Sequence, residues 1–108
     1  MRSRIVTGGT GRLVLDRLCD PVSGAYENAA TVTGTLSTAS GVLAGMDGVT
    51  LAYQSGTDGR YVATIPADAT LDLTPGDLVD AEVWAELPDG ALVPFRQRVR
   101  VVAASGPA

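Results

Sequence analysis

The chain has 108 residues, a net charge of −4 and a pI near 4.5, and it contains neither histidine nor lysine. Its length is that of one domain, and its acidity argues against nucleic acid as the main partner because like charges repel. Cys19 is the single cysteine, so an internal disulfide is excluded, and without histidine neither a Cys–His nucleophile nor an ordinary zinc site can be assembled.

The N-terminal end combines basic residues with glycine. Residues 1–11 hold Arg2 and Arg4, then the neighbours Ile5 and Val6, and then a glycine-rich run. Such a segment has little to bury, so we expect a flexible arm whose four named residues contact a neighbouring subunit. Neither a signal-peptide core nor the ~18 apolar residues of a membrane span is found. We therefore expect a protein made in a cytoplasm, with no membrane partner.

Strand-like segments follow the arm. Residues 12–18 alternate and run into a Pro and Gly turn, and residues 30–37 place Val and Leu on one face and Thr and Ser on the other. Residues 49–54 and 60–65 flank a glycine-containing loop, which predicts a hairpin. Residues 66–76 are typical of a crossover with one helical turn that ends at a Pro–Gly turn.

The last two segments, residues 78–87 and 93–102, are the most informative. Even-numbered positions carry acidic residues and a tryptophan in the first segment and arginines in the second. An odd-numbered loop between them pairs even positions with even ones, so we expect both rows on one face, with ion pairs and a cation–π contact. The face is either a solvated surface or a contact patch, since Trp and Arg are enriched at interface hot spots. The candidate residues on it are Trp84, Arg96, Arg98 and Arg100.

The spacing of these segments predicts an all-β fold. Six to seven short strands recur every 8–12 residues, and Gly and Pro interrupt the chain too often for an amphipathic helix. We expect an antiparallel, immunoglobulin-like β-sandwich of about seven strands over residues 12–104, with a small β-barrel as the alternative. Residues 105–108 are expected to form a C-terminal tail.

The sequence offers no evident catalytic or metal-binding constellation. General acid–base catalysis needs a tuned base, and the candidates are carboxylates scattered over loops, each with a commoner explanation in turn formation or capping. Their spacing lacks the calcium-loop pattern. We expect no enzyme, no catalytic residue, no cofactor, no metal and no small-molecule substrate, unless folding brings two carboxylates together. The carboxylates considered are Asp47, Asp58, Asp68, Asp72 and Asp77.

Three motifs carry a resemblance to a known group of proteins. A tyrosine strand at residues 51–53 is followed by "DGRYVATIPA" at 58–67 and by "LTPGD" at 73–77, ahead of the long final hairpin. The chain resembles small immunoglobulin-like proteins encoded in the structural gene clusters of tailed bacteriophages. The resemblance covers about residues 30–102. It implies a virion protein, such as a head-decoration, neck or tail-associated subunit, assembled in the cytoplasm of a bacterial host, and it transfers no catalytic residue.

Two functions of different classes remain open. The first is a non-enzymatic structural subunit that binds other virion proteins or copies of itself through the N-terminal arm and the sheet surface. The second is an immunoglobulin-like accessory module that binds carbohydrate or a cell surface, with Trp84 or Tyr26 as an aromatic platform.

Overall fold

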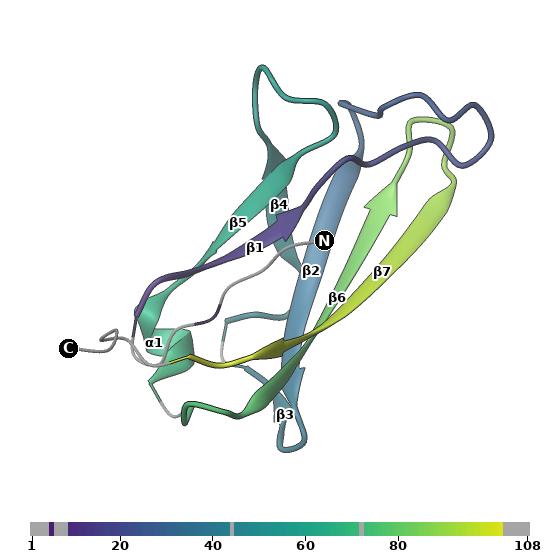
Figure 1. Cartoon of the computed structure of the whole chain (residues 1–108). Helices are drawn as coiled ribbons and strands as arrows, with labels where there is room; N and C mark the ends of the chain where they lie inside the picture. Colours follow the sequence, from purple (N-terminus) through teal and green to yellow (C-terminus); the bar gives the residue numbers. More distant parts are fainter. Residues whose placement is uncertain (1–4, 6–8, 44, 72, 103–108) are drawn as a thin grey trace.

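Seven strands and one short helix make up the described part of the computed structural model, which covers residues 5, 9–43, 45–71 and 73–102 (Figure 1). The elements in chain order are β1 (Gly11–Leu15), β2 (Thr31–Thr38), β3 (Gly41–Val42), β4 (Val49–Tyr53), β5 (Tyr61–Ile65), α1 (Ala67–Thr70), β6 (Leu78–Glu86) and β7 (Leu92–Arg100). No helix among the described residues has the length and apolar character needed to span a membrane.

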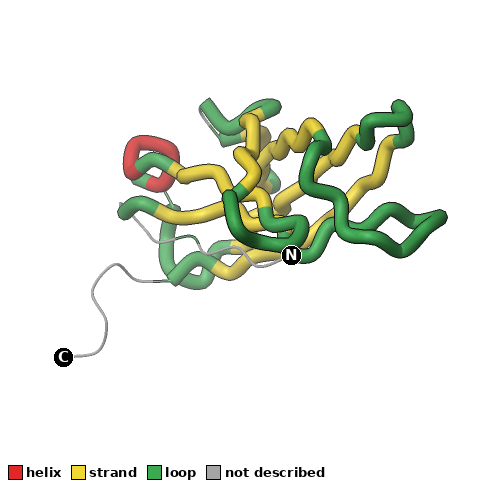
Figure 2. The backbone as a smooth tube through the Cα atoms, turned by 90° about the horizontal axis from the view of Figure 1, so that it is seen from above, coloured by secondary structure: helices red, strands yellow, loops and turns green. Residues whose placement is uncertain are grey.

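The strands form one continuous antiparallel sheet that curls around its core. Their order is β1-β5-β4-β2-β6-β7, and β3 pairs with β2 beside this path. The curl brings β1 across β2. The closeness of the two strands is seen at Gly34, where a Cβ would lie 2.6 Å from Cδ2 of Leu13. Viewed from above, α1 lies at one end of the molecule and long loops at the other (Figure 2). The predicted all-β, antiparallel fold of about seven strands is confirmed, and its single curled sheet has the outline of an opened barrel, which is consistent with both the β-sandwich and the small β-barrel expected from the sequence.

The core is built from alternate residues of these strands. Strand alternation turns every second side chain into the curl, and apart from Tyr61 the buried strand residues are small or aliphatic. Tyr61 is the largest side chain that is fully buried, and it packs 5.6 Å from the ring of Tyr53. The most deeply buried aliphatic members are Ile5, Leu13, Leu15, Leu18, Leu36, Met46, Ile65, Val32, Val79, Val83 and Val101.

Ile5 corrects the expectation for the N-terminal arm. Its side chain is completely buried in the core, and its carbonyl oxygen accepts a hydrogen bond of 3.1 Å from the N–H of Val102. An apolar side chain of this size stabilises the fold by about 1.5–3 kcal/mol when buried. The predicted arm at residues 1–11 therefore includes a core residue. Its remaining positions before Gly9, and the predicted tail at residues 105–108, lie outside the described residues.

The first strand is shorter than the sequence pattern predicts. β1 ends at Leu15 rather than at Leu18, because Arg17 adopts the left-handed φ of 55° and turns the chain out of the extended conformation. Leu18 then returns to the core, where its N–H donates to the carbonyl of Gly59 at 3.0 Å. The backbone atoms of Leu18 lie 2.5 Å from a Cβ placed on Gly59, so only glycine fits at that crossing.

Candidate functional site

The outer face of the β6–β7 hairpin carries the residues that the sequence singled out. Even positions pair with even positions, so Asp80 lies opposite Arg98 and Glu82 opposite Arg96. The predicted parity of the hairpin is confirmed. We call the solvent-facing even positions of β6 and β7 the outer sheet face. They are Leu78, Asp80, Glu82, Trp84 and Glu86 on β6 and Leu92, Pro94, Arg96, Arg98 and Arg100 on β7.

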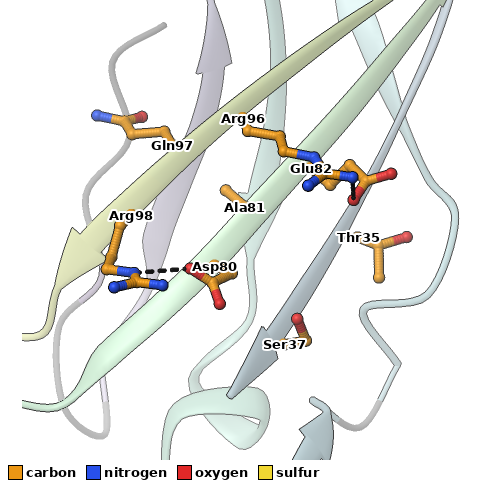
Figure 3. Close-up of a pocket in the computed structure, with 8 residues that line it drawn as sticks. All are labelled: Thr35, Ser37, Asp80, Ala81, Glu82, Arg96, Gln97 and Arg98. Atoms are coloured by element: carbon orange, nitrogen blue, oxygen red, sulfur yellow. Dashed lines mark hydrogen bonds and ion pairs between the residues drawn. The ribbon is translucent and has the colours of Figure 1, made fainter. Parts of the chain in front are cut away.

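Two ion pairs cross this face. Nε of Arg98 lies 3.0 Å from Oδ1 of Asp80, and Nη2 of Arg96 lies 3.4 Å from Oε2 of Glu82 (Figure 3). The arginine side chains are 65% and 79% exposed, so water screens both pairs. Each is worth about 0–1 kcal/mol. The pairs therefore order the charged groups of the face more than they stabilise the fold.

Arg100 differs from the other two arginines of its row. Its strand partner is Leu78, an exposed apolar residue, rather than a carboxylate. In the part of the chain that the structure describes, no carboxylate lies within ion-pair distance of its guanidinium. Among the described arginines of the outer sheet face, Arg100 is therefore the one whose charge remains available to a partner.

Trp84 lies among these charges and is 41% exposed. Its indole N–H donates a hydrogen bond of 2.8 Å to Oε1 of Glu82. The expected cation–π contact is not formed within the described residues, where Tyr53 and Tyr61 make the sole aromatic contact. The side chain of Glu82 thus joins Trp84 to Arg96, and the indole is held with one edge bonded and much of its surface in water.

Two exposed apolar residues of β7 lie beside Trp84. Pro94 lies opposite Trp84 across the hairpin, and Leu92, which is 61% exposed, lies opposite Glu86. On the other side Trp84 pairs with Thr33 of β2. We call Trp84, Leu92 and Pro94 the tryptophan patch. The sequence analysis missed Pro94, although its even number within residues 93–102 placed it on this face, and it missed Leu92, which lies one residue before that segment.

A polar hollow of about 390 Å³ adjoins the tryptophan patch (Figure 3). It lies over β2, β6 and β7, where Thr35 lies opposite Glu82 and Ser37 lies opposite Asp80 in the strand register. Arg96 and Arg98 project from one side of β7 and Gln97 from the other, as strand alternation requires. The hollow offers hydroxyl, carboxylate and guanidinium groups to a polar ligand.

Ile5 is the one predicted contact residue of the arm that the structure describes. Ile5 is buried in the core and cannot present its side chain to a partner. Arg2, Arg4 and Val6 lie outside the described residues. The interface expected from the sequence is therefore described by the structure only at Trp84, Arg96, Arg98 and Arg100.

Asp72, one of the five loop carboxylates considered, lies outside the described residues, and others of the five serve turns. Asp77 accepts a hydrogen bond from the N–H of Thr74, and Asp47 accepts one from the hydroxyl of Thr35, as turn residues do. Within residues 5, 9–43, 45–71 and 73–102, no three His, Cys, Asp or Glu side chains gather as metal ligands would. No protein-family model matches the chain, and neither curated proteins nor solved structures give a match.

Proposed function

We propose that the chain is a non-enzymatic structural subunit that binds neighbouring subunits through its outer sheet face. The resemblance of its strand and turn motifs to small phage proteins favours a tailed-phage virion as the assembly, with a place on the head, at the neck or on the tail. Assembly would then take place in the cytoplasm of the bacterial host. Its partners would be other virion proteins or further copies of itself.

The exposure of the tryptophan patch carries this proposal. A tryptophan and a leucine that remain in water beside a proline form an apolar surface that burial against another protein would stabilise. Tryptophan and arginine are the side chains most enriched at energetic hot spots. The ion pairs around the patch supply a polar rim with fixed charge positions, which favours one orientation of the partner.

The non-enzymatic part of the proposal rests on how the carboxylates are used. Asp80 and Glu82 lie in the hollow where a substrate would meet two acids, and each is bound to an arginine. Both carboxylates therefore already have a cationic partner, and they order the charged groups of the outer sheet face. Binding, rather than proton transfer, suits this arrangement.

The test compares two aromatic substitutions in the full chain. Proteins encoded next to this chain are co-expressed with it, and complexes are measured by size-exclusion chromatography with light scattering. We expect Trp84→Ala to abolish or weaken a complex by tenfold or more, and Tyr26→Ala, at an exposed tyrosine elsewhere, to leave it intact. If the native chain, Trp84→Ala and Tyr26→Ala all form the complex equally well, a role for the tryptophan patch is contradicted.

The polar hollow beside Trp84 supports one other function, binding of a carbohydrate. An exposed indole next to hydroxyl, carboxylate and guanidinium groups offers both a stacking surface and hydrogen bonds to a sugar. This alternative predicts a monomer whose affinity for a glycan is lost in Trp84→Ala. A glycan array followed by calorimetry on the positive sugars distinguishes the two functions.

A further inference from the structure

A groove opens at the end of the molecule that holds α1 and β3, away from the β6–β7 turn (Figure 1). Its volume is about 720 Å³. One wall is the β2–β3 hairpin, residues 38–43, and the other is formed by α1 and the segment that leads into β6. It therefore combines segments that lie about 30 residues apart in the sequence.

The walls of the groove are apolar and exposed. Val42 is 52% exposed and Leu78 is 44% exposed, and they lie on opposite walls. Ala69 and Leu73, which are buried, line the groove on the side of α1. Apolar side chains left in water around a concave surface are typical of a site that receives a short apolar or mixed segment.

The groove is also acidic. Asp68 and Asp77 are exposed and line it, and no arginine is among the described residues that do so. The sequence around it has the same bias, since residues 61–95 contain seven acidic residues and no basic one. The groove therefore attracts a basic segment.

The chain itself contains such a segment. Residues 1–15 include three arginines and no acidic residue, and two of the arginines, Arg2 and Arg4, lie within the first four positions beside Met1. Ile5 fixes the start of this segment, because its side chain is in the core and its carbonyl bonds to Val102. Four residues in extended conformation reach roughly 13 Å from that anchor.

We propose that the groove receives residues 1–4 of a second copy of the chain. Met1 packs against the apolar walls at Val42 and Leu78, and the two arginines pair with Asp68 and Asp77. This inference rests on the proposed function, since it supplies a contact between copies of a structural subunit. It uses a surface separate from the tryptophan patch, so either can fail without the other.

The contact has a directional consequence. The donor segment and the receiving groove are different surfaces, so each copy can give one contact and accept another. Such a head-to-tail contact closes into a ring or extends into a filament, according to the rotation between copies.

Complementary variants of the full chain test this arrangement. An arm variant carries Arg2→Ala and Arg4→Ala and keeps its groove intact. A groove variant carries Asp68→Lys and Asp77→Asn and keeps its arm intact; asparagine retains an oxygen that accepts the bond from the N–H of Thr74. Self-association is measured by sedimentation velocity over a range of concentration and salt.

We expect the native chain to associate with rising concentration and each variant alone to associate at least about tenfold more weakly. An equal mixture of the two variants should form a one-to-one dimer that grows no further, because one copy has the only good arm and the other the only good groove. The association should weaken with salt, as exposed ion pairs do.

Two control variants separate this contact from others. Asp58→Lys repeats the charge change of Asp68→Lys on the β4–β5 loop, at the far end of the molecule, and should leave association unchanged. Leu92→Ala truncates an exposed leucine of the tryptophan patch and should also leave it unchanged. A native chain that stays monomeric, variants that associate normally, or a mixture that stays monomeric would each overturn the proposal. None of these outcomes bears on binding through Trp84, which the co-expression test measures separately.

Discussion

The two faces of β6 differ sharply in burial. On the inner face, Val79, Ala81, Val83 and Ala85 are at most 1% exposed, whereas the alternating residues of the outer face are charged, aromatic or in water. Both faces belong to one strand with one hydrogen-bond register. The inner face therefore supplies stability, and the outer face supplies the groups that a partner can contact. Substitutions on the two faces should accordingly affect stability and binding separately.

The largest effect is expected from a charge on the inner face. Val83→Asp buries an unpaired carboxylate in the core and should lower the free energy of unfolding by about 3–5 kcal/mol, which is enough to unfold many domains. The matched outer substitution, Glu86→Thr, should change it by about 0.5 kcal/mol or less. Urea unfolding followed by circular dichroism measures both. Similar losses in the two variants would mean that the faces are not distinct.

A smaller loss is expected where the two halves of the sheet meet. A Cβ at position 34 would lie 2.6 Å from Leu13 and 3.2 Å from Leu51, so Gly34→Ala should overpack the core by about 1–3 kcal/mol. Adding Leu13→Val removes the closest atom. The double variant should therefore lose less stability than the sum of the two single variants, as a double-mutant cycle would show. If the two losses of stability simply add, the cost of Gly34→Ala does not come from its contact with Leu13.

The hydroxyl of Tyr61 ties the core to the loop before β2. It donates to the carbonyl of Glu27 at 2.8 Å and accepts from the N–H of Ala30 at 3.1 Å. Tyr61→Phe leaves both backbone groups without this partner and should cost about 1–3 kcal/mol. Tyr26→Phe, at an exposed ring, should cost much less. Thermal melts of the two variants side by side provide the comparison.

The same tyrosine predicts a loss of stability at high pH. Burial raises the pKa of Tyr61 above its ordinary value of 10.0, and the hydrogen bond from Ala30 offsets part of this rise. The folded chain thus keeps the phenol proton to higher pH than the unfolded chain does. The contribution to stability is fully present below pH 10 and is lost as the pH rises through the pKa of the folded state. The free energy of unfolding, measured at pH 9 and at pH 11, should fall in the native chain and fall less in Tyr61→Phe. An equal fall in both proteins would mean that other groups cause the loss of stability.

The smallest effect is expected on the outer face. Arg98→Ala removes one exposed ion pair with Asp80 and should change the free energy of unfolding by about 0–1 kcal/mol, with a still smaller difference at high salt. Unfolding measured in low and in 1 M salt tests this. A loss as large as that of Tyr61→Phe would show that the ion pair supports the sheet itself.

The strands were predictable where their signals are local. The hairpins at β4–β5 and β6–β7 lie within one or two residues of the segments expected, because alternation and glycine turns are read from neighbouring residues. β3, Gly41–Val42, was missed because two residues carry no alternation. The burial of Ile5 and the order of the strands depend on contacts between distant parts of the chain, which no local pattern reports.

The candidate surfaces divide in the same way. The ion pairs between β6 and β7 followed from the parity of one loop, so sequence reasoning placed Arg96 and Arg98 correctly on the acidic face. The tryptophan patch needed only the same parity applied to Leu92 and Pro94. The groove could not be inferred, because it exists only where residues 38–43 meet the segment around α1.

Pro94 has a further effect through its place in β7, the last strand of the sheet order. Val101 bonds to Gly76 and Asp77 on the β6 side and Val102 bonds to Ile5, so alternation turns the even-numbered N–H groups of β7 away from β6. At position 94 that edge has no N–H to offer. A strand from a misfolded chain therefore cannot extend an unbroken ladder along this edge, which should help the protein resist aggregation when it is overproduced.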